Sequence, residues 1–458
     1  MTPILLRSTL IAALGGLLFG FDTAVISGTT EWLREVYRLS PGGLGFTVAA
    51  ALIGTICGAL LAGRPADRWG RRTVLFAIAW LYLLSALGTA LAWDWYSFLF
   101  FRFIGGIGVG GASVVAPMYI AEISPAHCRG RLVAVTQFNI VLGILLAFFS
   151  NFLIARLHIG PTEWRWMFGV EAVPAAAFLV LLLWTPYSPR WLVMRNRIEE
   201  ARQVLSRLGT DSGSVDGEIR EIQASIDLEH HSLREPLFQR KYLKPVLLAV
   251  AIAAFNQLSG INALMYYAPH IFRLAGEGTE SALLQTVAVG GTNLVFTMAA
   301  LLVIDHFGRR KLMLAGSIGY ILSLSATAVA FYAGAQPASG AAAAGGGFSE
   351  SMGLVVLIGL LVFIASHAFG QGAVIWVFIS EIFPNRVRAR GQALGSFTHW
   401  FMAALISWTF PVIAAESGGH AFAFYAVMMV FQLLWVLYVM PETRGVPLEQ
   451  IQRRLGID

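Results

Sequence analysis

Asp67-Arg68-Trp69-Gly70-Arg71-Arg72 returns in the second half of the chain as Asp305-His306-Phe307-Gly308-Arg309-Arg310, with the acid, the glycine and both arginines in place. Each copy follows the second apolar run of its half. After the fourth run of each half, a Glu-Ile-x-Pro segment is duplicated as well, and an arginine follows its glutamate by seven residues. Two repeats in parallel orientation are typical of secondary transporters whose substrate site lies between the repeats.

The rest of the chain consists mainly of apolar runs that suit a bilayer. Of the 458 residues, 57% are apolar and only 13% are charged, whereas soluble domains carry about a quarter charged residues. A hydrocarbon core about 30 Å thick needs about 20 apolar residues per helix. The sequence therefore predicts an all-α membrane protein with twelve transmembrane helices in two six-helix pseudo-symmetric halves. The runs are 5–28, 44–63, 73–93, 97–120, 132–155, 166–185, 245–272, 282–304, 312–334, 352–380, 391–415 and 420–440.

Four regions follow from these runs. Residues 1–189 form the N-terminal half, 190–244 a linker with short amphipathic helices, 245–441 the C-terminal half, and 442–458 a tail. The loops on the linker side hold twelve Lys and Arg residues and the alternate loops hold five, which predicts that the first set and both termini are cytoplasmic. We therefore expect a multi-pass protein of the cytoplasmic, or inner, membrane. We also expect it to work as a monomer. The Ala/Gly-rich stretch 336–347 receives no function.

Several other classes of function are disfavoured. Cys57 and Cys128 lack metal-ligand spacing, so we expect no metal site. The net charge of +6 lies in short loops, as in membrane proteins, and does not indicate nucleic acid. The segment Gly106–Gly111 fits the G-x-G-x-x-G pattern but lies inside an apolar run, which indicates helix packing. Without a Walker motif or a nucleophile set, we expect neither an ATP-driven pump nor an enzyme, and no cofactor apart from a coupling proton.

The duplicated segments place a carboxylate near two arginines in each half. A carboxylate between two guanidiniums at a helix end makes charge-assisted bonds, and such bonds could hold the cytoplasmic face closed. The alternative is plain loop charge that obeys the positive-inside rule. The residues of this predicted gate are Arg71, Glu122, Arg129, Arg309, Glu381 and Arg388.

Three charged residues lie well inside apolar runs: Asp22 in the first, Arg102 in the fourth and Glu171 in the sixth. Each costs about 2.5–3.5 kcal/mol in hydrocarbon on insertion scales, so partners are expected. Chain direction puts all three in the outer half of the bilayer, where they can meet. An Asp whose proton affinity changes as an Arg approaches is a candidate proton carrier. The alternative is a static ion pair that fixes helix packing.

Other polar residues inside the runs suit a sugar, whose hydroxyls both donate and accept hydrogen bonds. Asn and Gln side chains also do both, and aromatic faces can cover the ring. Ser259-Gly260 predicts an opening in the seventh helix that lets its polar side chains face one cavity. For each residue the alternative is hydrogen bonding between helices. The candidates are Gln137, Asn256, Gln257, Asn262, Tyr266, Asn293, Trp376, His399 and Trp400.

Nearly the whole chain resembles the sugar porters of the major facilitator superfamily, which include bacterial sugar/proton symporters and the facilitative glucose transporters of animals. The segments that carry the resemblance are Gly20–Gly28, Gly63–Arg68, Ser188-Pro189-Arg190, Gln257–Asn262 and Pro441–Gly445. It implies that Asp22 takes the proton, that Arg102 is its partner and that Glu171 assists. It also implies sugar contacts at Gln137, Gln257, Asn262, Asn293, Trp376 and His399, and a cavity lined by Phe19, Ile140, Tyr266 and Gly372.

This chain also departs from the family pattern. Asn256 replaces the first Gln of the usual Gln-Gln pair, and the segment Gly370–Trp376 lacks the prolines of animal glucose transporters. Animal uniporters lack an acid where Asp22 stands, which favours proton coupling. The function expected is import of a monosaccharide, glucose or a related hexose or pentose, by proton symport through alternating access. The alternatives are a facilitative uniporter and a sugar sensor on the same fold.

Overall fold

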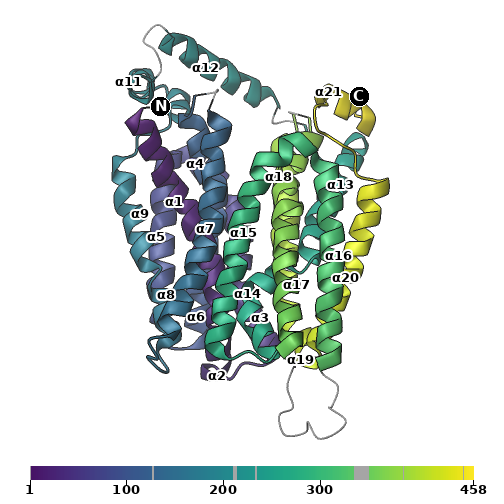
Figure 1. Ribbon diagram of the computed structural model, residues 1–458. Coiled ribbons are helices and arrows are strands. Elements are labelled where there is room, and N and C mark those ends of the chain that lie inside the picture. Colours follow the sequence, from purple (N-terminus) through teal and green to yellow (C-terminus); the bar gives the residue numbers. More distant parts are fainter. Residues whose placement is uncertain are drawn as a thin grey trace, which may run out of the picture. The chain divides into compact units, whose positions relative to one another are not determined.

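This computed structural model describes residues 2–125, 128–209, 214–232, 235–334, 350–384, 386–446 and 448–457. All regular structure in these ranges is helical (Figure 1). Twelve helical segments within them are long and apolar enough to cross a membrane, which confirms the predicted fold class. The low-complexity stretch 336–347 lies outside the described residues.

The first six spans follow the predicted apolar runs closely, but the sixth is interrupted. Its helix α8 ends at Gly169 and α9 begins at Ala172, so Glu171 occupies the break between them. The elements are α1 (Pro3–Val25), η1 (Ile26–Gly28), α2 (Thr30–Val36), α3 (Pro41–Leu61), α4 (Gly63–Trp69), α5 (Arg71–Ala90), α6 (Trp95–Ile123), α7 (Arg129–Ala155), α8 (Glu163–Gly169), α9 (Ala172–Leu181) and η2 (Leu182–Trp184).

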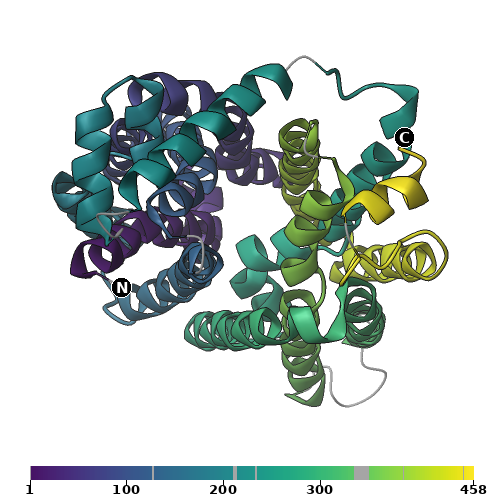
Figure 2. The same cartoon turned by 90° about the horizontal axis from the view of Figure 1, so that it is seen from above.

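The linker forms the short helices that its periodicity predicts. α11 buries Ala201, Leu205 and Leu208 and leaves its charged face exposed. It packs against α10 and α12, near the start of α1 (Figures 1 and 2). The elements are α10 (Pro189–Met194), α11 (Ile198–Leu208), α12 (Val215–Ser232) and η3 (Arg240–Tyr242).

Two of the last six spans are broken at glycines. The seventh opens at Gly260, whose φ of +86° suits a residue without a Cβ, as Ser259-Gly260 predicts. The tenth breaks at Gly370, which no feature of the apolar run 352–380 indicates. The elements are α13 (Leu243–Leu258), α14 (Ile261–Leu274), α15 (Thr279–Phe307), α16 (Arg309–Gly334), α17 (Glu350–Phe369), α18 (Gln371–Ile382), α19 (Arg388–Glu416), α20 (Gly418–Tyr438) and α21 (Leu448–Leu455).

By their contacts the residues group into two compact units. Unit 1 comprises Met1–Thr23, Ala50–Ala147 and Arg165–Glu235, and unit 2 comprises Ala24–Ala49, Phe148–Trp164 and Pro236–Asp458. In unit 1, α5 packs against α6 and α9. In unit 2, α16 packs against α17 and α20, and α13 packs against α19. Unit 2 thus includes η1, α2 and the adjoining ends of α3 and α7 from the first half of the sequence.

Glycines bring α3 and α6 into backbone contact within unit 1. A Cβ at Gly106 would lie 1.9 Å from the carbonyl oxygen of Ala51, and one at Gly110 would lie 2.1 Å from that of Thr55. Gly54 and Gly58 make the reciprocal approach to α6. The Gly106–Gly111 segment therefore serves helix packing, as its position in an apolar run predicts.

We expect Gly106→Ala to lower the free energy of unfolding of the detergent-solubilised protein by about 1–3 kcal/mol, because α3 and α6 must separate to admit the methyl group. The unfolding temperature should fall accordingly. Gly291→Ala is the matched control, since a Cβ at Gly291, also in a membrane helix, meets nothing within 4 Å. Equal unfolding temperatures for the two variants would contradict this account of the α3–α6 contact.

Candidate functional site

Asp22 and Arg102 form a buried ion pair inside unit 1. Their side chains approach to 2.7 Å between Oδ1 and Nη1, and Nη2 of Arg102 also donates to the Asp22 carbonyl at 3.1 Å. Both residues are 1% exposed. The Arg102 guanidinium also lies 5.3 Å from the ring centroid of Phe168. α1 and α6 thus bring together two charges that the sequence places 80 residues apart.

Glu171 shares this buried environment without a direct bond to the pair. It is 1% exposed, and it interacts electrostatically with both Asp22 and Arg102. Neither of its carboxyl oxygens has a hydrogen-bond partner among the described residues, and the Oδ2 atom of Asp22 also lacks one. Glu171 is the residue directly before α9, in the break between α8 and α9. The site therefore holds two carboxyl groups, one guanidinium and unsatisfied acceptor atoms.

Gln257 is the centre of a polar cluster in unit 2. Its Nε2 donates to Oδ1 of Asn256 at 2.9 Å and lies 3.2 Å from Nδ1 of His399, while its Oε1 accepts from Nδ2 of Asn262 at 2.8 Å. The break at Gly260 carries Asn262 around to Gln257, a bond that a continuous helix would not allow between residues five positions apart. These four predicted residues lie together.

Aromatic rings adjoin this cluster. The ring centroid of His399 lies 5.0 Å from that of Trp376 and 4.9 Å from that of Trp400. Trp376 is 41% exposed, so part of its side chain is not covered by protein. Tyr266 and Asn293 are buried in the same unit, and Oδ1 of Asn293 accepts from Thr297. Gly372 lies beside the ring of His367, a residue absent from the predicted site.

The remaining predicted sugar residues belong to unit 1. Gln137 and Ile140 lie on α7 and are half-buried, and Phe19 on α1 is also half-buried. A Cβ at Gly20 would lie 1.9 Å from the carbonyl oxygen of Ile140, so α1 and α7 are in backbone contact beside these side chains.

In the first half of the chain, a charged network (the N-half network) joins the end of α6 to the starts of α5 and α10. Nη2 of Arg71 lies 2.9 Å from Oε1 of Glu122, and Arg71 also pairs with Asp67 at 3.0 Å. The other oxygen of Glu122 accepts a short hydrogen bond from the hydroxyl of Ser188. Arg71 is buried, so these bonds are partly shielded from water.

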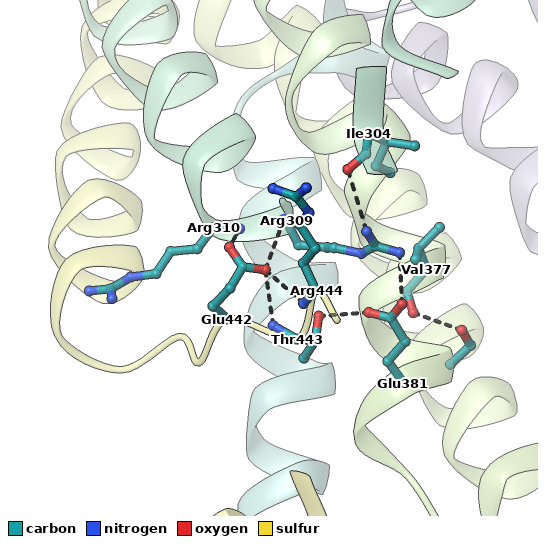
Figure 3. Close-up of polar contacts among 9 residues, drawn as sticks. Ile304, Arg309, Arg310, Val377, Glu381, Glu442, Thr443 and Arg444 are labelled. Atoms are coloured by element: carbon teal, nitrogen blue, oxygen red, sulfur yellow. Dashed lines mark hydrogen bonds and ion pairs between the residues drawn. The ribbon is translucent and has the colours of Figure 1, made fainter. Parts of the chain in front are cut away.

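The second half contains an equivalent arrangement, the C-half network (Figure 3). Nη2 of Arg309 lies 2.8 Å from Oε1 of Glu381, and Thr443 donates to the other oxygen of Glu381 at 2.6 Å. Glu442 accepts hydrogen bonds of 3.0–3.1 Å from four backbone N–H groups, those of Arg309, Arg310, Thr443 and Arg444. Its carboxylate therefore caps the first turn of α16.

The predicted second arginine of each network bonds to a backbone carbonyl oxygen instead of to the glutamate. Arg129 donates to the carbonyl oxygen of Ser124 at 3.4 Å, and Arg388 donates to that of Phe383 at 3.3 Å. A hydroxyl group, from Ser188 or Thr443, takes its place on each glutamate. Sequence reasoning missed these hydroxyls, although both stand in the Ser188-Pro189-Arg190 and Pro441–Gly445 segments.

One further cluster in unit 2 joins α2 to α14. Nδ1 of His270 donates to Oε1 of Glu31 at 2.5 Å, and Arg273 pairs with Oε2 at 3.1 Å. The hydrogen bond from His270 holds the pKa of Glu31 below its usual value, and the nearby charges of Arg273 and Arg34 act in the same direction. Glu31 is therefore an ionised anchor at neutral pH.

The whole arrangement matches one known family. The family model "Sugar (and other) transporter" covers residues 8–455. This chain belongs to that family. As a member it is a multi-pass transporter and not an enzyme, as the sequence predicts.

Its relatives match along nearly their full length. The chain is 37% identical to the D-xylose-proton symporter of Escherichia coli, over 97% of this chain and 94% of the relative. It is also 37% identical to a glucose transport protein of Synechocystis, over 96% of this chain and 95% of that relative. Among solved structures, the inward open conformation of the E. coli xylose transporter has a TM-score of 0.85 at 36% identity, and covers 98% of this chain and 99% of that one.

Proposed function

We propose that this transporter imports a monosaccharide together with a proton. The observation that carries the proposal is the buried Asp22–Arg102 pair beside Glu171. A carboxyl group that leaves its guanidinium partner gains affinity for a proton, because burial favours the neutral form. The relatives named for proton-coupled sugar transport support this function.

A sugar is the substrate class that best fits the cluster around Gln257. Amide groups, an imidazole and a tryptophan face provide donors, acceptors and an apolar surface, which together suit a ring that carries hydroxyl groups. The relatives act on pentoses and hexoses, so glucose and xylose are the first candidates. Gln137, Phe19 and Ile140 of unit 1 stay predicted sugar-binding residues.

Alternating access would supply the path across the membrane. In this scheme the N-half and C-half networks lie on the cytoplasmic side together with both termini, and their rupture opens the inner face. The Glu31 cluster would then lie on the outer side. The protonated carboxyl would release its proton after the sugar has entered, when Arg102 returns to Asp22.

The decisive experiment uses purified protein in proteoliposomes with an imposed proton gradient. We expect labelled glucose or xylose to accumulate inside only while the gradient lasts, and a proton-gradient uncoupler to reduce uptake to equilibration. Sugar-driven alkalinisation of the outer medium should accompany uptake. Uptake that ignores the uncoupler would favour the facilitative uniporter, in which Asp22 is a static partner of Arg102. Sugar binding without any flux would favour the sensor.

Glu31→Gln should lower the stability of the α2–α14 contact at pH 7 by about 0.2–1 kcal/mol, since the pair is partly exposed. The contribution of Glu31 is complete above its usual pKa and is lost as pH falls through the lowered value, where protonation removes the charge. The difference in unfolding temperature between wild type and variant should therefore shrink as pH falls below the usual Glu pKa of about 4.3, and it should vanish only below the lowered pKa of Glu31. Glu35→Gln, on the same helix and exposed, is the control. Equal stability of wild type and Glu31→Gln at pH 7 would contradict the expectation.

A further inference from the structure

His367 is a polar residue on the buried face of α17 that neither the coupling site nor the cluster around Gln257 includes. It follows Leu360, Phe363 and Ile364 on one helical stripe, and these three are at most 1% exposed. His367 itself is only half-buried. His367 is therefore less covered by protein than the residues that precede it on the stripe, and it lies one turn before the break at Gly370.

One ring nitrogen of His367 is committed to a fixed partner. Nδ1 lies 2.7 Å from the hydroxyl oxygen of Tyr320 on α16, and Tyr320 is fully buried. The two rings also touch, with centroids 6.1 Å apart. Tyr320 thus holds the imidazole in one orientation.

The other ring nitrogen, Nε2, has no hydrogen-bond partner among the described residues. It faces Gly372 on α18, where a Cβ would stand 3.5 Å from it, so the glycine leaves this edge of the ring uncovered. His367 also interacts electrostatically with His399, the partner of Gln257. The free nitrogen therefore lies in the neighbourhood of the polar cluster.

We propose that Nε2 of His367 binds one hydroxyl group of the transported sugar and so contributes to the choice of sugar. The proposal rests on the proposed function. It holds for either ring tautomer, because a hydroxyl group accepts from Nε2–H or donates to bare Nε2 equally well. Tyr320 is a positioning residue, and Gly372 admits the hydroxyl by its lack of a side chain.

The test compares single-deoxy analogues of glucose as competitors of labelled glucose exchange in proteoliposomes. We expect wild type to bind one analogue about 5- to 100-fold more weakly than glucose on account of His367, the usual result of an unpaired buried polar group. In His367→Phe, the affinity for glucose should fall by that factor while the affinity for this one analogue stays the same. The ratio of the two affinities should therefore fall to about one. Ratios for the other analogues should stay as in wild type. The matching fluoro-sugar, which accepts but cannot donate, then identifies the tautomer.

Two further variants keep the outcome decisive. His367→Ala opens space where Phe would fill it. In this variant too, the affinity ratio of glucose to that one analogue should fall to about one, so the test stands even if His367→Phe does not fold. His420→Phe is the control, because His420 lies in the first turn of α20 in the same unit and its ring packs against that of Tyr332, with the centroids 5.6 Å apart. If both His367 variants keep every wild-type ratio, the proposal is overturned and sugar transport stands. If wild type neither binds nor exchanges any sugar, the proposed function itself fails.

Discussion

Asp22→Asn is expected to abolish accumulation of sugar against its gradient while exchange of sugar across the membrane continues. The amide keeps the shape of the carboxyl group and its hydrogen bond to Arg102, whose guanidinium lies 2.7 Å from Oδ1. It cannot take up and release a proton. Each proton that enters under a potential of 100 mV carries about 2.3 kcal/mol, equivalent to almost 50-fold accumulation of a neutral sugar. The variant should lose this entire factor.

Accumulation and exchange are measured on the same proteoliposomes, with and without a proton gradient. The control is Asp94→Asn, because Asp94 caps α6 through a hydrogen bond from the Ser97 backbone and Asn serves that purpose equally well. Asp94→Asn should accumulate sugar like wild type. Full uphill uptake by Asp22→Asn would remove Asp22 from the proton path.

Gln257→Ala should weaken sugar binding by about 1–3 kcal/mol, or roughly 5- to 150-fold, the cost of unpaired buried polar groups. Gln257 is 1% exposed and holds Asn256, Asn262 and His399 in place through its amide group. Its removal therefore deprives the sugar of one partner and disorders three others. The overall fold should survive, because the helix break depends on Gly260 and not on this side chain.

Calorimetric titration of glucose and xylose into the purified variant measures the loss directly. Gln203→Ala on the exposed face of α11 is the control and should bind as wild type does. An unchanged affinity in a folded Gln257→Ala protein would place the sugar site elsewhere.

The fold was predictable because its two signals, apolar runs of bilayer length and the duplicated charged segments, can each be recognised within short stretches of sequence. Runs of bilayer length revealed twelve spans, and a glycine after a serine revealed the opening at Gly260. The breaks at Gly370 and around Glu171 were not predictable from the same signals. An apolar run looks identical whether its helix is continuous or interrupted, and the interruption is decided by packing against neighbours.

The part of the candidate site that could be predicted is the pair whose residues lie at the same depth in the bilayer. Asp22 and Arg102 had to meet, since each needs a partner at the same level of the bilayer. The hydrogen-bond partners of Glu122 and Glu381 could not be predicted in this way. A long arginine side chain can reach several acceptors, and tertiary packing decides which of them it binds. Arg129 and Arg388 bind carbonyl oxygens for this reason, while Ser188 and Thr443 reach the carboxylates.

Glu442 sets a limit on how this protein can be shortened or joined to another. Its carboxylate gathers the N–H groups of Arg309 and Arg310 at the start of α16. A chain cut after Tyr438, where the last membrane helix ends, would lose this cap and the Thr443 hydroxyl that binds Glu381. A reporter or purification tag is therefore best attached beyond Leu455, where α21 ends, so that residues 441–446 stay in their native contacts.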